Sequence, residues 1–163
     1  IFPLALSDKE NIISYFNETK FSEGSSISNF NSDVDYRGEI VKENQIKNKY
    51  NLFGTNIDNL ILNKILTVPN YIKIDVDGIE HLILKGAENL LKNKYLKELS
   101  IETNPSYVKQ YELINNIMEE NNFKKVASLN KRLLSDKNYK LKSNETVNEI
   151  FKKNIWNFYL INF

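Results

Sequence analysis

The stretch Tyr71-Ile-Lys-Ile-Asp-Val-Asp-Gly-Ile-Glu80 decides the fold class of this chain. Its apolar residues alternate with polar ones, which is the period-two pattern of a β-strand. Gly78 then provides a turn, and a helical pattern begins directly after it. Open α/β sheets place ligand chemistry at the carboxyl ends of their strands. Asp75 and Asp77 are therefore candidate site residues.

Further elements are predicted on both sides of this strand. The pattern favours strands over 1–7, 12–16, 96–103, 123–128 and 155–163, and helices over 56–63, 79–92 and 106–121. The first two strands are expected to form a hairpin around a turn at 8–11, and 21–37 and most of 130–153 are expected to be loop. This alternation of strands and helices is typical of an α/β sheet with short crossovers.

Composition excludes several classes of protein. The chain has 163 residues, of which 41% are hydrophobic and 26% charged, as in a single soluble globular domain. It has no cysteine, so disulfides and thiolate metal sites are excluded. No apolar run reaches the roughly 20 residues of a membrane span, and no basic leader opens the chain. We expect a cytoplasmic protein without a membrane partner.

Charge is unevenly distributed along the chain. Residues 123–163 hold nine Lys/Arg and three Asp/Glu, a net charge of +6. A basic end can bind nucleic acid or an anionic substrate. The lysines are scattered without interleaved stacking aromatics, however, so a solvated edge is the better interpretation and a nucleic-acid partner is not expected.

The acids near the strand ends allow more than one interpretation. Asp75 can pair with Lys73 on the same face of the strand, and Asp77 can cap the following helix. Glu102, at the end of the next strand, could join them and Glu80 in an acidic cluster that holds Mg²⁺. The plainer interpretation of Glu80 is an acid that complements a helix dipole.

The only histidine does not indicate a hydrolase. A Ser-His-Asp site would need His81 as its base, but no nucleophile elbow lies near it. We expect a surface or cleft-edge histidine.

Three motifs at characteristic spacings resemble the FkbM-type methyltransferases, which are S-adenosylmethionine-dependent enzymes of the Rossmann-like class. They are Lys73-Ile-Asp-Val-Asp-Gly-Ile-Glu80, Leu84-Lys-Gly-Ala87 and Leu99-Ser-Ile-Glu-Thr-Asn104. Asp77 stands where that family usually has Glu, which keeps the charge. Weaker similarity is found at 5–8, 24–26 and 56–60.

The resemblance implies a partial Rossmann-like class I methyltransferase sheet with flanking helices. Sheets of this class usually have the strand order 3-2-1-4-5-7-6, and by similarity this chain begins at the third strand. The family's glycine-rich cofactor loop is missing, because no two of the five glycines form G-x-G. We therefore expect one domain over 1–163, truncated at its N-terminus. Its 71–76 strand would have an open edge, which predicts either a homodimer or a rearranged N-terminal strand.

The resemblance also implies the chemistry. The expected reaction is S-adenosylmethionine-dependent O-methylation of a hydroxyl on a sugar, glycan or small metabolite. Asp75, Asp77 and Glu102 would be catalytic, and Ser7, Asp8 and Asp75 would bind the cofactor, with no metal. The alternative is a catalytically inactive folded fragment that acts as an interaction module, because it lacks the cofactor loop.

Overall fold

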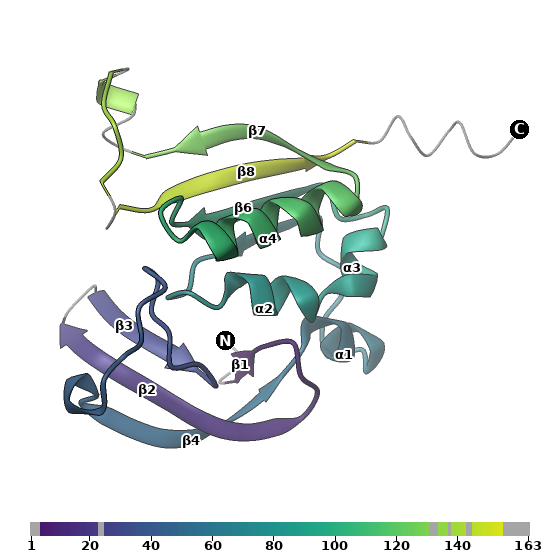
Figure 1. Ribbon diagram of the computed structural model, residues 1–163. Helices are drawn as coiled ribbons and strands as arrows, with labels where there is room; N and C mark the ends of the chain where they lie inside the picture. Colours follow the sequence, from purple (N-terminus) through teal and green to yellow (C-terminus); the bar gives the residue numbers. More distant parts are fainter. Residues whose placement is uncertain (1–3, 23–24, 131–133, 137, 143–144, 155–163) are drawn as a thin grey trace, which may run out of the picture.

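Two four-stranded mixed sheets and four short α-helices form the chain, seen in a computed structural model that describes residues 4–22, 25–130, 134–136, 138–142 and 145–154. Helices α2 and α3 lie between the sheets in Figure 1. The elements are β1 (Ala5–Leu6), β2 (Ile12–Ser22), β3 (Ser25–Phe30), the 3₁₀-helix η1 (Glu43–Gln45), β4 (Asn48–Thr55), α1 (Ile57–Leu62), β5 (Tyr71–Ile74), α2 (Glu80–Lys85), α3 (Glu88–Lys92), β6 (Glu98–Thr103), α4 (Val108–Glu120), β7 (Phe123–Leu129) and β8 (Val147–Lys153).

The first sheet has the order β1-β4-β2-β3. The predicted hairpin between β1 and β2 is wrong, because β4 lies between them. Ala5 pairs with Gly54 in parallel, and Ile12 pairs with Gly54 from the other side in antiparallel. The turn at 8–11 thus carries the chain across β4 rather than back onto β1.

The stretch 21–37 is not all loop, as the sequence had suggested. It contains the end of β2 and the whole of β3, which pair as an antiparallel hairpin with a bulge between Glu18 and Lys20. Polar residues such as Asn29 hid this strand, since asparagine and serine are poor strand formers in isolation. Phe30 explains why it forms, because its ring is 2% exposed and packs in the core.

The second sheet has the order β5-β6-β8-β7. β5 and β6 are parallel, and β8 runs antiparallel to both of its neighbours. The predicted strand at 155–163 lies outside the described residues. β8 instead falls within the stretch predicted to be loop, because its inward-facing set includes the charged residues Glu149 and Lys153. Lys153 Nζ donates to Leu91 O at 2.5 Å and to Asn93 O at 2.9 Å, so the buried ammonium is paired.

The predicted helix over 79–92 is divided into α2 and α3. A Cβ added to Gly86, which lies between them, would lie 2.2 Å from the Ser7 carbonyl oxygen, so the helix passes in contact with β1. A side chain of α1 accepts hydrogen bonds from the first backbone N–H groups of α3. The Asp58 carboxylate accepts from Asn89 N at 2.7 Å and from Leu90 N at 2.9 Å. The helices predicted at 56–63 and 106–121 are confirmed as α1 and α4.

One hydrophobic core joins both sheets. It includes Phe30 from the first sheet, Ile74 and Ile101 from the second, and Leu84 and Leu91 from the helices between them. The chain is therefore a mixed α/β protein. Among the described residues, none of the helices has the length and apolar character needed to cross a bilayer.

Candidate functional site

Acidic side chains meet at the carboxyl ends of β5 and β6. Asp75 directly follows β5, and Glu102 lies near the end of β6, so parallel pairing brings the two strand ends side by side. Lys73 hydrogen-bonds and forms an ion pair with Asp75, which holds the pKa of that carboxyl below its usual range. Asp75 also interacts with Glu102. The predicted Lys73–Asp75 pair is confirmed.

Glu102 differs from Asp75 in the direction of its pKa shift. It is half-buried, and burial raises the pKa of its carboxyl. Thr146, just before β8, donates its hydroxyl to Glu102 Oε1 at 2.7 Å. A carboxylate held ionised by Lys73 thus lies beside a carboxyl group with a raised pKa. Such a pair can accept a proton from a hydroxyl and hold it.

Asp77 does not cap a helix, as its position had suggested. Its Oδ2 accepts from the backbone N–H of Ser28 in β3 at 2.9 Å, and α2 has no side-chain cap. Burial raises the pKa of this carboxyl. The contact ties the end of β5 to the first sheet, so Asp77 joins the two sheets at the site.

Glu80 is buried behind the turn. Its side chain is 3% exposed, and burial raises its pKa to about 8. Gln110 of α4 donates from Nε2 to Gly78 O at 2.6 Å and to Glu80 Oε2 at 3.0 Å, and the same nitrogen lies 3.1 Å from His81 Nδ1. These contacts fix the turn at Gly78. His81 is half-buried, and burial lowers the pKa of its imidazole.

The predicted cofactor residues at the end of β1 have polar partners of their own near that strand end. Ser7 is buried, and its Oγ accepts from Lys9 N at 3.0 Å. Asp8 forms an ion pair with Lys9 at 3.3 Å. Within the described residues, no hydrogen bond or ion pair connects either of them with Asp75. The structure therefore does not bring the three predicted cofactor residues into one contact network.

An apolar cavity of about 230 Å³ runs along the open edge of β5. It is lined by Leu6, Ile72, Ile74, Ile83 and Leu91, among others, and Asp75 lies at its polar end. Cofactor pockets usually measure about 300–1,000 Å³. The cavity alone, with the Asp75 carboxylate beside it, fits a small apolar group or one part of a larger ligand.

A metal site finds no support in the described part of the chain. No group of three or more histidine, aspartate or glutamate side chains converges there closely enough to hold an ion. Glu80 is hydrogen-bonded to Gln110 behind the turn, so it is not an available ligand beside Asp75.

Sequence reasoning missed the residues that support the site from a distance. Gln110 was overlooked because glutamine is mostly an exposed residue in folded proteins. The buried set of α4 is Gln110, Ile114 and Met118, at a spacing of four. A glutamine in phase with two apolar residues was the available signal.

The segment 31–47 was also overlooked, although it packs against the site. A Cβ on Gly78, whose φ is +106°, would lie 2.7 Å from the Asp35 carbonyl oxygen. Asn104, directly after β6, donates from Nδ2 to Tyr36 O at 3.3 Å. The carboxyl ends of both strands are thus covered by this segment.

Comparison with known proteins agrees with these motifs. The profile of the Methyltransferase FkbM domain matches residues 2–141. No curated protein and no solved structure gave a match. The profile covers most of the chain and includes both strand ends of the acidic site, so the protein belongs to the FkbM methyltransferase family.

Proposed function

We propose that this chain carries the acceptor side of an O-methyltransferase site that uses S-adenosylmethionine, as is typical of its family. The acceptor would be a hydroxyl on a sugar or small metabolite. The paired carboxyl groups of Asp75 and Glu102, at neighbouring strand ends, are the observation that carries this proposal.

The strand order supports the same proposal. β5-β6-β8-β7, with an antiparallel third strand, agrees with the 4-5-7-6 end of a class I methyltransferase sheet. In such a sheet β5 would be the fourth strand, whose carboxyl end faces the reacting groups. We propose that the second sheet is this half of a Rossmann-like fold.

The proposed roles follow from the protonation of each group. Asp75 is held ionised by Lys73 and would accept the hydroxyl proton of the acceptor. Glu102 would hydrogen-bond the same oxygen and position it, since Thr146 fixes its side chain. Asp77 would keep the strand end in place through Ser28. The cofactor would supply the electrophilic methyl group.

Calorimetric titration with S-adenosylhomocysteine tests the cofactor part of the proposal. Saturable one-site binding that is weakened in Asp75→Asn would support a cofactor site beside β5. The matched control is Glu120→Gln, an exposed acid at the C-terminal end of α4. Absence of heat at millimolar ligand would contradict cofactor binding by this chain.

A folded interaction module is the second candidate function. It is favoured by the open edge of β5, which pairs only with β6 in the described residues. Antiparallel pairing of two β5 edges around Ile74 would place Lys73 opposite Asp75 of the second copy, so the edge is complementary to itself in charge. Light scattering over a range of concentrations tests it: a dimer that Lys73→Glu weakens is expected, and a monomer throughout would contradict the homodimer.

A further inference from the structure

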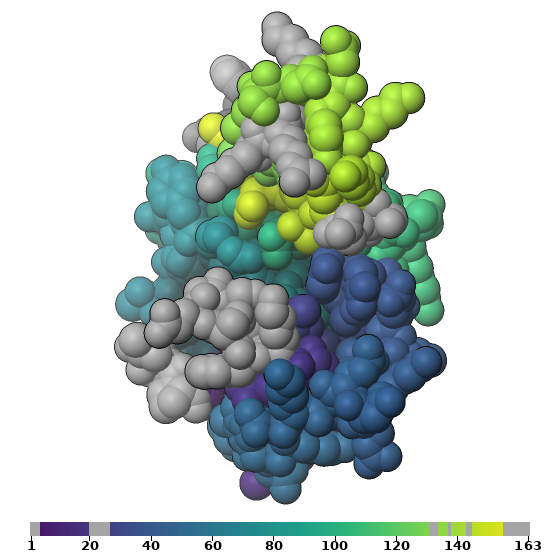
Figure 2. All heavy atoms as spheres, turned by 90° about the vertical axis from the view of Figure 1, so that its left-hand side faces the viewer, coloured from purple at the N-terminus to yellow at the C-terminus, as the bar shows by residue number. Residues whose placement is uncertain are grey.

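A second cavity lies between the β2–β3 hairpin and the segment 31–47. Its volume is about 410 Å³, within the usual range of small-molecule sites. Figure 2 shows the face of the molecule on which the 31–47 segment, in blue, lies below the yellow-green β7–β8 region. Its lining contains both apolar and polar side chains, among them Ile27, Ile40, Val41, Thr19, Arg37 and Gln45. None of the acids of the site on β5 and β6 lines it.

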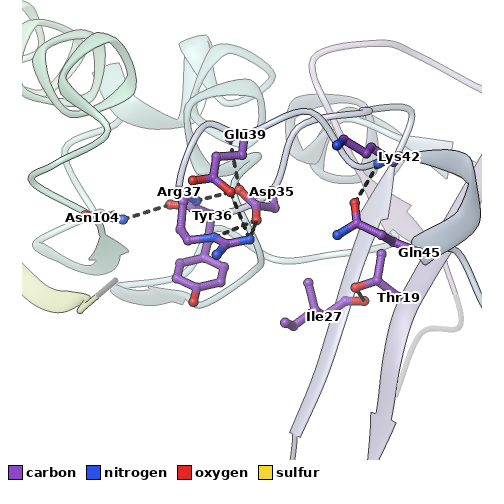
Figure 3. Close-up of polar contacts among 9 residues, drawn as sticks. All are labelled: Thr19, Ile27, Asp35, Tyr36, Arg37, Glu39, Lys42, Gln45 and Asn104. Carbon is purple, nitrogen blue, oxygen red and sulfur yellow. Dashed lines mark hydrogen bonds and ion pairs between the residues drawn. The ribbon is translucent and has the colours of Figure 1, made fainter. Parts of the chain in front are cut away.

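The arginine of this cavity is held in place before any ligand binds. Asp35, which is 5% exposed, accepts from Arg37 Nη2 at 2.7 Å, from Arg37 Nε at 2.9 Å and from the Arg37 backbone N–H at 2.9 Å. Glu39 adds an ion pair to Nη2 at 3.1 Å. In Figure 3 this group lies on one side, with Gln45 and Thr19 on the other. A fixed guanidinium loses little side-chain entropy when a ligand binds.

The charges of the lining balance. The lining holds two acids, Asp35 and Glu39, and two bases, Arg37 and Lys47. The Arg37 guanidinium forms ion pairs with both acids. A site selective for phosphate or carboxylate would present unpaired positive charge. Besides these four charged residues, the lining presents the neutral hydrogen-bonding side chains of Thr19, Asn44 and Gln45. The side-chain carbonyl of Gln45 accepts from Lys42 N at 2.8 Å, which leaves its amide N–H groups for a ligand.

Two buried asparagines lie on the strands β2 and β3 that border the cavity. Asn17 and Asn29 pair across β2 and β3, and each is 2% exposed. Neither polar side-chain atom of Asn17 has a hydrogen-bond partner in the described structure, and Asn29 Oδ1 also has none. Asn29 is two positions from Ile27, so the two side chains share a face of the strand. Such buried groups cost stability unless something pairs with them.

A bulge marks the same place. It lies at Thr19, whose hydroxyl donates to Ile27 O at 3.3 Å and keeps its lone pairs for another donor. Bulges often lie next to functional sites, where they redirect a side chain. Thr19 and Gln45 line the cavity and together offer a donor and acceptors beside the apolar side chains of Ile27 and Val41.

We infer that this cavity binds an uncharged polyhydroxylated ligand of saccharide type. Hydroxyl groups donate and accept, which matches amide and threonine side chains, and the C–H faces of a sugar ring match Ile27 and Val41. The ligand is bound here and not transformed, so the inference does not depend on methyl transfer.

Amide-resolved NMR titration tests this inference. The probes are neutral mono- and disaccharides built from glucose, galactose, mannose and N-acetylglucosamine, with glucose 6-phosphate and glucuronate as charged comparisons. We expect at least one neutral sugar to shift the amide signals of β2, β3 and 37–47, with a Kd of about 1 mM. No shift with any neutral sugar up to about 100 mM, shifts confined to another surface, or tenfold tighter binding of a charged sugar would overturn the inference.

Three variants sharpen the test. Gln45→Ala and Thr19→Val remove surface-accessible hydrogen-bonding groups, and each is expected to weaken binding about tenfold. Asn115→Ala removes an amide on α4 outside the cavity and is the matched control. Unchanged binding in both Gln45→Ala and Thr19→Val would overturn the inference.

Discussion

The acidic site on β5 and β6 and the cavity beside the β2–β3 hairpin are built in opposite ways. The acidic site comes mostly from one continuous motif, in which strand, turn and helix follow each other within ten residues from Tyr71 to Glu80. The cavity is assembled from a hairpin and a loop whose polar residues carry no periodic pattern. Local motifs can therefore be found in a sequence, whereas sites made by long-range pairing of polar residues remain hidden until the fold is known.

Asp75→Asn should give the largest difference between its effect on methyl transfer at the acidic site and its effect on saccharide binding in the cavity. Removing a general base usually costs about 10²–10⁴ in rate, so methyl transfer to a hydroxyl acceptor should fall by that factor, while saccharide binding in the cavity stays unchanged. Radiolabelled methyl transfer and the NMR titration measure the two effects on the same sample. An unchanged rate would remove Asp75 from the proposed chemistry.

Glu80→Gln should change the pH dependence of stability. Burial raises the pKa of Glu80 to about 8 in the folded state, so folding takes up a proton between the unfolded pKa and that value. The contribution of Glu80 to the unfolding free energy is fully present below about pH 4.5. It is lost as the pH rises toward 8. The glutamine variant should be less sensitive to pH and about 3 kcal/mol more stable near pH 8.

Urea unfolding from pH 5 to pH 8.5 measures this effect. Glu88→Gln, an exposed first-turn acid of α3, is the control. Parallel pH profiles for wild type and Glu80→Gln would contradict the assignment of a buried neutral carboxyl to Glu80.

Gly78→Ala should disturb both regions at once. The residue has φ +106°, and its new Cβ would approach the backbone of Asp35 to 2.7 Å. We expect a loss of about 2–3 kcal/mol in unfolding free energy. Gly38→Ala is the comparison, since at φ +81° its Cβ would meet the ring of Tyr107, a side chain that can move. A smaller loss is expected there, and equal losses would contradict the role of the backbone contact.

Asn104→Ala should have the smallest effect. Its amide donates to Tyr36 O, and its Oδ1 accepts from Ser106 N at 2.9 Å. Loss of these bonds should cost about 1 kcal/mol and weaken saccharide binding slightly, because Tyr36 lies within the segment that forms the cavity. Thermal unfolding and the NMR titration measure both. Wild-type affinity together with wild-type stability would show that the two regions are independent.

The elements that sequence reasoning predicted correctly depend on neighbouring residues. Asn56 was expected near the start of a helix, and its side chain accepts from Asn59 N at 2.7 Å. The strand at Tyr71 follows from its alternation. The errors arose where distant residues competed. Asp77 was expected to cap the following helix, but its carboxylate accepts from the backbone N–H of Ser28 instead. β4 separates the two strands of the predicted hairpin.

The candidate site shows the same limit. Asp75 and Glu102 were expected together because parallel strand ends meet, and they interact. Gln110 could not be expected from its own sequence context alone, since its partners at Gly78 and Glu80 are 32 and 30 residues away. β8 was hidden because Glu149 and Lys153 interrupt its apolar alternation, although both are buried.

The Asp58 carboxylate that holds the start of α3 has a consequence for the order of assembly. Helices as short as α1 and α3 are unstable in isolation. Because Asn89 N and Leu90 N bond to a side chain of α1, α3 gains its first turn only when α1 is docked. The two helices should therefore open as one cooperative unit, and the amide hydrogens of Asn89 and Leu90 should exchange with solvent at the rate of α1 rather than at that of their own helix.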